Sequence, residues 1–195
     1  MAKNEVDKIS AARRQISAAI RMLFSDEDPL AIHTVVSAGF RILKDLAQKQ
    51  DSEVLEMFNL SFRPGRKEKF WRVEVSYMAN FLKHADKDPD HVLKKFEERV
   101  NDHLIFFGCE LYRDIVPRDK VQKPTLEMAA FIEWYAEMYP NSLVYIPDDL
   151  LRSQKTAFVR MSALSRPEQL AQGHLKLESW ESFRPSTRTR GGWEA

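Results

Sequence analysis

Two apolar stripes at helical spacing run through residues 4–48, NEVDKISAARRQISAAIRMLFSDEDPLAIHTVVSAGFRILKDLAQ. Apolar residues recur there every three or four positions, as they do on the buried face of an amphipathic helix. The first stripe predicts a helix over Asn4–Phe24, and the second predicts one over Pro29–Gln48. Asp28 followed by Pro29 suits the cap and the first turn of the second helix. The sequence therefore predicts an antiparallel helical hairpin.

The rest of the chain continues the helical pattern. Six glycines in 195 residues and the lack of long alternating runs favour helix over sheet. Further helices are predicted over Ser52–Phe58 with Asp51 or Ser52 as cap, over Lys67–His84, from Pro89 with Asp88 as cap, over Thr125–Tyr139, and, from a weaker pattern, over Asp148–Leu164 and from Arg166. We predict an all-α fold: an antiparallel helical bundle over residues 1–164, then a short helix and a flexible Arg-rich C-terminal tail over residues 165–195.

The composition limits the setting of the protein. Thirty Lys and Arg against 29 Asp and Glu give a formal net charge of +1, which argues against binding nucleic acid through overall charge but leaves room for a local basic patch. The lone cysteine, Cys109, cannot form an intrachain disulfide and is expected to be a small buried residue. No secretory signal and no apolar run of ~20 residues is present. We expect a soluble, cytoplasmic protein with no membrane partner.

The densest group of chemically capable side chains is Asn80-Phe-Leu-Lys-His84-Ala-Asp86-Lys-Asp88-Pro-Asp90. Asn80 and His84 share one stripe of the Lys67–His84 helix, which is apolar on nearly every side and predicted to be buried centrally. Both side chains are therefore predicted to enter the bundle. His84 can act as a general acid or base, with Asn80 orienting it. The structural alternative places His84 at the helix C-terminus for its dipole and Asn80 against a loop.

Other residues are candidates for the same site. His33 falls on the inward side of the second predicted helix, where it either approaches His84 or is an ordinary core histidine. Arg66 and Lys67, interleaved with aromatic residues, can contact a phosphate backbone while the rings stack on bases. The alternative for these two is a solvated helix start.

Metal and cofactor signatures are weak. Three aspartates between residues 86 and 90 have the spacing of the start of a calcium loop, but His91 stands where that loop needs glycine. No HExxH, CxxC or phosphate-binding Gly-rich loop occurs. We expect no metal and no cofactor. The alternative of a metal-dependent helical hydrolase would use His33, His84, Asp86 and Asp88.

The segment Asn80-Phe-Leu-Lys-His84 resembles the motif of the HEPN superfamily, small all-α proteins of bacterial defence systems, toxin–antitoxin pairs and RNA processing. That motif is an Arg, usually followed by a polar residue such as Asn, then three residues and a His. Ala79 stands at the Arg position, so Arg72 or Lys83 is the candidate for the missing charge. The absent Arg weakens the expectation of cleavage more than that of the fold, because developing phosphoryl charge loses its donor.

The resemblance implies metal-independent RNA cleavage across a homodimer interface. His84 would act on the ribose 2′-hydroxyl or on the leaving oxygen, and Asn80 would position the reacting groups. We therefore expect a HEPN-like protein that binds or cleaves RNA in a bacterial stress or phage-defence setting. The alternative from a different class is a non-enzymatic interaction module, in which the Arg-rich tail with Trp180 and Trp193 docks a protein partner.

Overall fold

The computed structural model describes residues 5–61, 75–84, 86, 89–116, 123–140 and 156–182. Every regular element within these residues is helical, which confirms the all-α prediction. The helices are α1 (Lys8–Phe24), α2 (Pro29–Lys49), α3 (Glu53–Ser61), α5 (Met78–Phe81), α6 (Val100–Ile115), α7 (Leu126–Met138) and α9 (Arg166–Ser182). Residues 156–162 form a further helical segment shortly before α9.

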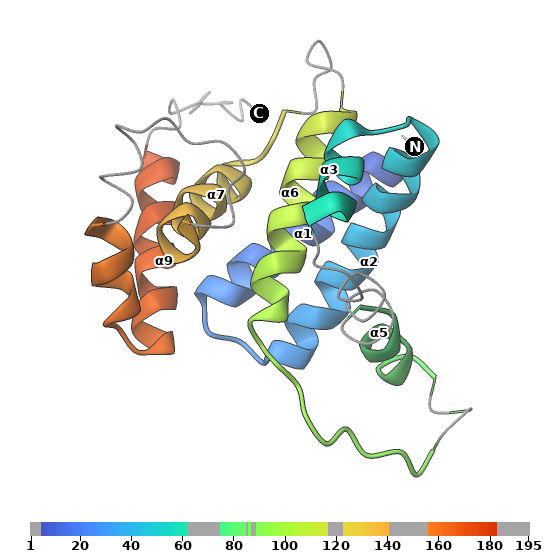
Figure 1. The fold of residues 1–195 in the computed structure, drawn as a ribbon, viewed down its shortest axis with the longest axis horizontal. Coiled ribbons are helices and arrows are strands. Elements are labelled where there is room, and N and C mark those ends of the chain that lie inside the picture. Colours follow the sequence, from blue (N-terminus) through green and yellow to red (C-terminus); the bar gives the residue numbers. More distant parts are fainter. Residues whose placement is uncertain are drawn as a thin grey trace, which may run out of the picture.

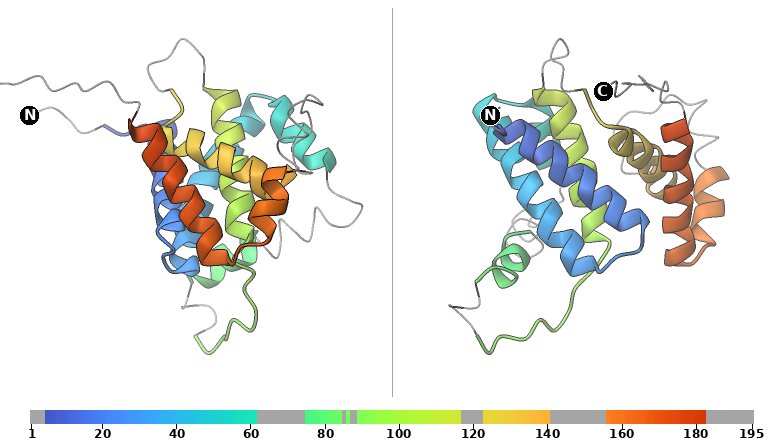
Figure 2. Two further views of the ribbon diagram at one scale, coloured as in Figure 1. Left: turned by 90° about the vertical axis from the view of Figure 1, so that its left-hand side faces the viewer. Right: turned by 180° about the vertical axis from the view of Figure 1, so that it is seen from behind.

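The helices form two adjoining groups. Figures 1 and 2 show α1, α2 and α6 side by side, with α7 and α9 packed together on one side of them and α5 at the opposite edge. Helix α1 contacts α2, α6, α7 and α9, so it joins the two groups. Within the described parts of the chain, no helix combines the length and the apolar character that a membrane span requires.

Side chains cap three helix starts, and two of these caps, Asp28 and Ser52, confirm predictions from the sequence. Asp28 precedes α2, Ser52 precedes α3 and Thr125 precedes α7. In each case a side-chain oxygen accepts hydrogen bonds from backbone N–H groups two or three residues later, at 2.9 to 3.2 Å. These bonds satisfy amide groups that have no partner inside the helix. The cap residues therefore fix where these helices begin.

Helices α1 and α9 have other limits than predicted. Helix α1 begins at Lys8 rather than at Asn4, because Asp7 is in an extended conformation and its carboxylate accepts the N–H of Ser10 at 2.6 Å. Helix α9, predicted as a short helix, runs for 17 residues. The tail beyond it, residues 183–195, and the residues 148–155 of the predicted Asp148–Leu164 helix lie outside the described residues.

The helix predicted to begin at Pro89 is wrong. Residues 91–97 are not helical, and α6 begins only at Val100. Val92, which was expected on the buried face, is 71% exposed. A short amphipathic helix depends on packing for its stability, and residues 91–97 are exposed or only partly buried against the described parts of the chain. Once α6 has begun, it continues through Gly108 to Ile115.

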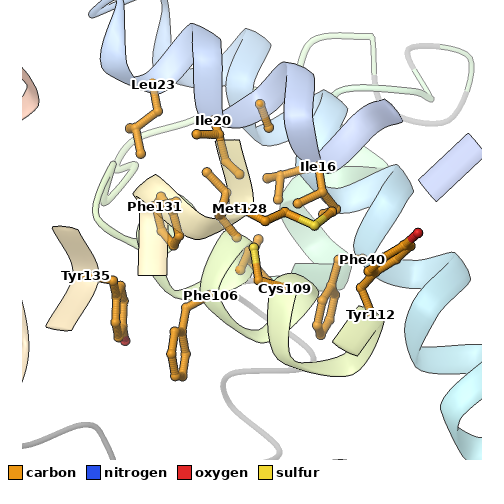
Figure 3. Close-up of a cluster of buried hydrophobic side chains, with 14 of the residues drawn as sticks. Ile16, Ile20, Leu23, Phe40, Phe106, Cys109, Tyr112, Met128, Phe131 and Tyr135 are labelled. Carbon is orange, nitrogen blue, oxygen red and sulfur yellow. The ribbon is translucent and has the colours of Figure 1, made fainter. Parts of the chain in front are cut away.

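The main core lies between α1, α2, α6 and α7. Figure 3 shows Phe106 and Cys109 from α6 facing Phe131 and Tyr135 from α7. Phe106 and Tyr135 stack with their ring centroids 4.1 Å apart. Cys109 is 4% exposed, which confirms the prediction of a small buried residue, and burial raises the pKa of its thiol well above the ordinary value.

Two glycines permit close helix contacts at α1. A β-carbon at Gly108 would lie 2.7 Å from a methyl carbon of Ile16, and one at Gly173 would lie 2.2 Å from a ring carbon of Phe24. Both distances are shorter than van der Waals contact between carbon atoms. The lack of a side chain therefore sets how closely α6 and α9 approach α1.

An ion pair fastens α9 to α6. Asp102 is fully buried in α6, and the guanidinium of Arg166 donates to both of its carboxylate oxygens, at 2.7 and 3.0 Å. The Tyr139 hydroxyl, just after α7, donates to the same carboxylate at 2.6 Å. The buried negative charge is thus both neutralised and hydrogen-bonded, as a charge removed from water requires.

Trp134 connects α7 with α9 and α1. Its side chain is fully buried, and its indole N–H donates to the backbone carbonyl of Gln169 at 2.8 Å. Its ring meets the edge of Phe24 with centroids 5.6 Å apart. The guanidinium of Arg166 lies 5.7 Å from the ring centroid, within the range of a cation–π contact. This tryptophan therefore packs against both neighbouring helices.

Candidate functional site

Asn80 and His84 are on the surface rather than inside the molecule. Helix α5 lies at the edge of the fold (Figure 1). It buries Met78 and Ala79, while Asn80 is exposed and the His84 side chain is 41% exposed. Nδ1 of His84 is 3.8 Å from a carboxylate oxygen of Asp86. The prediction that both polar side chains point into the bundle is therefore wrong for the described part of this helix.

Tyr77 explains why the predicted stripe faces outward. Its spacing of three and seven residues from Asn80 and His84 predicts the same buried face for all three, but Tyr77 is 38% exposed. Its hydroxyl forms a hydrogen bond with Nε2 of His91, from the non-helical segment before α6. Phe81 also contacts the His91 ring, with centroids 5.7 Å apart. Spacing alone gives a stripe, and the neighbouring segments decide which stripe is covered.

His33 is a core histidine. It is fully buried in α2, and its Nδ1 forms a hydrogen bond of 2.9 Å with the side-chain oxygen of Asn101 in α6. Burial lowers the pKa of His33; the bond to Asn101 opposes this, and the positive charge of Lys83 adds to the lowering. The exposed Lys83 is thus in the electrostatic neighbourhood of His33. These observations agree with the structural alternative for His33.

The other residues predicted for the site lie outside the part of the chain that the structure describes. Arg66, Lys67 and Arg72 lie outside the described residues, as do Asp88 and the tail with Trp193. Among the residues that the structure describes, no three histidine, cysteine or acidic side chains are grouped as a metal site would require.

A hollow between α1 and the start of α7 gathers three arginines. Its volume is about 360 Å³, and its lining comprises Arg13, Arg14, Ser17, Arg21, Pro124, Thr125, Leu126 and Glu127. We call it the arginine pocket. Three of these residues follow each other at intervals of four along α1, which places Arg13, Ser17 and Arg21 on one helical face. Helices α1 and α7 are in direct contact, so this face meets the α7 cap.

Hydrogen bonds between α1 and the start of α7 form the floor of the arginine pocket. The hydroxyls of Ser17 and Thr125 are 2.8 Å apart and hydrogen-bonded, and Ser17 is only 5% exposed. Thr125 also caps α7 by accepting the N–H of Met128 at 3.2 Å. These bonds hold the α1 face against the first turn of α7. The arginine side chains around them therefore extend from a fixed base.

The three arginines differ in how they are held. Nε of Arg13 donates to the backbone carbonyl of Lys123 at 3.1 Å, which leaves its two terminal nitrogens for other partners. Arg21 pairs with the carboxylate of Glu127, although its side chain is 51% exposed. Arg14 is exposed, and no hydrogen bond or ion pair joins it to the parts of the chain that the structure describes. The lining thus contains guanidinium nitrogens that have no hydrogen-bond partner among the described residues.

Glu127 is the one acidic group among the described residues of the lining. Burial alone would raise the pKa of this carboxyl, but hydrogen bonds from its own backbone N–H, from Thr125 and from Arg21 outweigh burial and lower the pKa. Glu127 is therefore ionised at neutral pH and occupies part of Arg21. Among the described residues, three guanidinium groups against one carboxylate give the lining a net charge of +2. Such a site is suited to bind an anion with oxygen acceptors.

Sequence reasoning assigned Arg13, Arg14 and Arg21 no role beyond the polar sides of the first helix. A signal was present, because arginines flank the small Ser17 at helical spacing. What the spacing cannot supply is the opposite wall, since Thr125 follows Ser17 by 108 residues.

Comparisons of the whole chain with protein-family models, with curated proteins and with solved structures give no match.

Proposed function

We propose that this protein binds RNA and that the arginine pocket holds one of the RNA phosphates. The observation that carries the proposal is the convergence of Arg13, Arg14 and Arg21 on one hollow with few internal partners. Planar guanidinium groups match phosphate oxygens with paired hydrogen bonds. The local excess of positive charge stands out in a chain whose formal net charge is +1. RNA is favoured over DNA because Asn80 to His84 resembles the HEPN motif.

The test is a binding isotherm of a short labelled single-stranded RNA with wild type and with Arg14→Gln. We expect the Kd to rise about tenfold, because a charge-assisted hydrogen bond contributes about 1.5–3 kcal/mol. Arg14 is preferred to Arg21, whose replacement would also release Glu127. The slope of log Kd against log salt should fall by about 0.7 for each phosphate contact removed.

Arg160→Gln is the matched control for this experiment. Arg160 is also a surface arginine, with a side chain that is 66% exposed, and it belongs to the helical segment before α9. Its replacement removes the same charge from the protein and should leave the Kd unchanged. The proposal fails if the triple variant Arg13→Gln, Arg14→Gln, Arg21→Gln binds RNA as tightly as wild type.

RNA cleavage at His84 is the second candidate function. It is favoured by the exposure of Asn80 and His84 on one helix end, where a bound strand has access to both. A carboxylate oxygen of Asp86 lies 3.8 Å from Nδ1 of the imidazole. In this reaction His84 would transfer a proton at the ribose 2′-hydroxyl or the leaving oxygen, with Asn80 positioning the scissile group.

For the cleavage test, labelled RNA is incubated with wild type, His84→Ala and His174→Ala in excess chelator. We expect chelator-resistant cleavage by wild type and by His174→Ala, and a loss of at least about a hundredfold in His84→Ala, as for removal of a general acid or base. His174 is a suitable control because it is 50% exposed and lies 3.5 Å from a carboxylate, that of Glu178. Intact RNA in all three reactions would contradict cleavage and leave RNA binding as the activity.

A further inference from the structure

We propose that the arginine pocket selects a terminal phosphomonoester of RNA over the phosphodiesters inside the strand. This inference rests on the proposed RNA binding and specifies which phosphate is bound. It is carried by two features of the pocket: its net charge and the number of its donor groups.

The charge of the lining matches a phosphomonoester. In the part of the lining that the structure describes, three arginines and one glutamate give a net charge of +2. A phosphomonoester carries about −1.5 to −2 charges at pH 7, because its second pKa is about 6. A phosphodiester in the RNA backbone carries a single negative charge. The monoester therefore neutralises the pocket, whereas the diester leaves it with unbalanced positive charge.

The donor groups and the volume of the pocket also favour a phosphomonoester. A phosphomonoester has three terminal oxygens, and Arg13, Arg14 and Arg21 provide one guanidinium for each. A phosphodiester has only two non-bridging oxygens, so it can accept fewer hydrogen bonds from the same guanidinium groups. The volume of about 360 Å³ is at the lower end of the range for a single small ligand. It accommodates a phosphate with its sugar rather than a length of backbone.

Glu127 limits the selection. Its carboxylate pairs with Arg21, so an incoming phosphate has to compete for that guanidinium. Attraction to the arginines and repulsion from Glu127 both grow with the charge of the phosphate, and the dianion gains more than the monoanion because the arginines outnumber the carboxylate. Glu127 therefore sets how strongly the pocket prefers a dianion. We assign Glu127 as a specificity-determining residue of the pocket.

The experiment compares RNAs of one sequence that carry a 5′-phosphate, a 3′-phosphate or hydroxyls at both ends. Their Kd values are measured by fluorescence anisotropy with the full chain at fixed salt and at about pH 7.5, above the second phosphate pKa. We expect one phosphorylated RNA to bind at least about tenfold more tightly than the hydroxyl RNA. The phosphorylated RNA with the lower Kd shows which end of the RNA the pocket recognises.

Three further measurements tie the selection to the pocket. Glu127→Gln removes the negative charge that repels the phosphate, so it should tighten binding of the phosphorylated RNA more than that of the hydroxyl RNA, and the ratio of the two Kd values should grow severalfold. The ratio in wild type should shrink between about pH 7 and pH 5, where the monoester gains a proton and becomes a monoanion. Arg14→Gln should reduce the ratio toward one.

The possible outcomes separate this inference from the proposed function. Equal Kd values for all three RNAs, with binding lost in the triple arginine variant, would overturn the monoester selection and retain RNA binding in the pocket. A phosphate preference that persists in the triple variant would also overturn the inference, since another site would then be responsible. Absence of binding to every RNA would overturn both.

Discussion

Replacement of Arg166 by methionine is expected to lower the free energy of unfolding by about 3–5 kcal/mol. Methionine keeps much of the side-chain volume but removes the charge that neutralises the fully buried Asp102. Only the Tyr139 hydroxyl would then remain among the hydrogen bonds described for this carboxylate. Urea denaturation followed by far-ultraviolet circular dichroism measures the change, provided that the transition is two-state.

Two further variants identify the buried charge as the cause. Arg160→Met removes an arginine whose side chain is 66% exposed and whose nearest carboxylate, on Glu137, is 3.9 Å away, so a change below about 1 kcal/mol is expected. The double variant Asp102→Asn, Arg166→Met should be more stable than Arg166→Met alone, because no unpaired charge is left inside. A double variant that is less stable than both single variants would contradict this explanation.

Replacement of Trp134 by alanine is expected to destabilise the protein by about 3–5 kcal/mol. The fully buried indole fills the space between α7, α9 and Phe24, and truncation leaves a cavity there. It also removes the N–H that the carbonyl of Gln169 accepts, so a buried acceptor loses its partner. Because α9 packs mainly on α7, we expect protease cleavage in α9 to accelerate along with the loss of global stability.

Trp180→Ala is the control for the tryptophan prediction. Trp180 is 37% exposed near the end of α9, and its indole N–H donates to Glu133 at 3.1 Å. The same atoms are deleted as in Trp134→Ala, but no enclosed cavity is created, so we expect a loss of about 1 kcal/mol or less. Similar losses of stability for the two variants would show that the burial of Trp134 between α7 and α9 is not the cause of the effect.

Local signals in the sequence were sufficient for several helix starts and misleading for another. The dipeptides Asp28-Pro29 and Asp88-Pro89 are identical, yet Pro29 begins α2 while the residues after Pro89 are not helical. The difference lies in packing, since Ile32 is buried against the core whereas Val92 is 71% exposed. A cap determines where a helix begins only if the following residues have a surface to cover.

The candidate site was less predictable than the fold for the same reason. A four-residue spacing placed Asn80 and His84 on one stripe but could not show that Met78 and Ala79 would be the covered side chains of α5. The arginine pocket depends on a contact between segments about a hundred residues apart, which no local pattern encodes. Its presence follows from the packing of α1 on α7.

Alkylation of the single cysteine, Cys109, can report how often the core of the protein opens. Cys109 is enclosed between α1, α6 and α7, and burial raises the pKa of its thiol, so in the folded state it is neither accessible nor in the reactive thiolate form. Alkylating reagents can therefore modify it only in molecules whose core has opened. The labelling rate of this one position thus measures the population of open molecules, at native concentration and without denaturant.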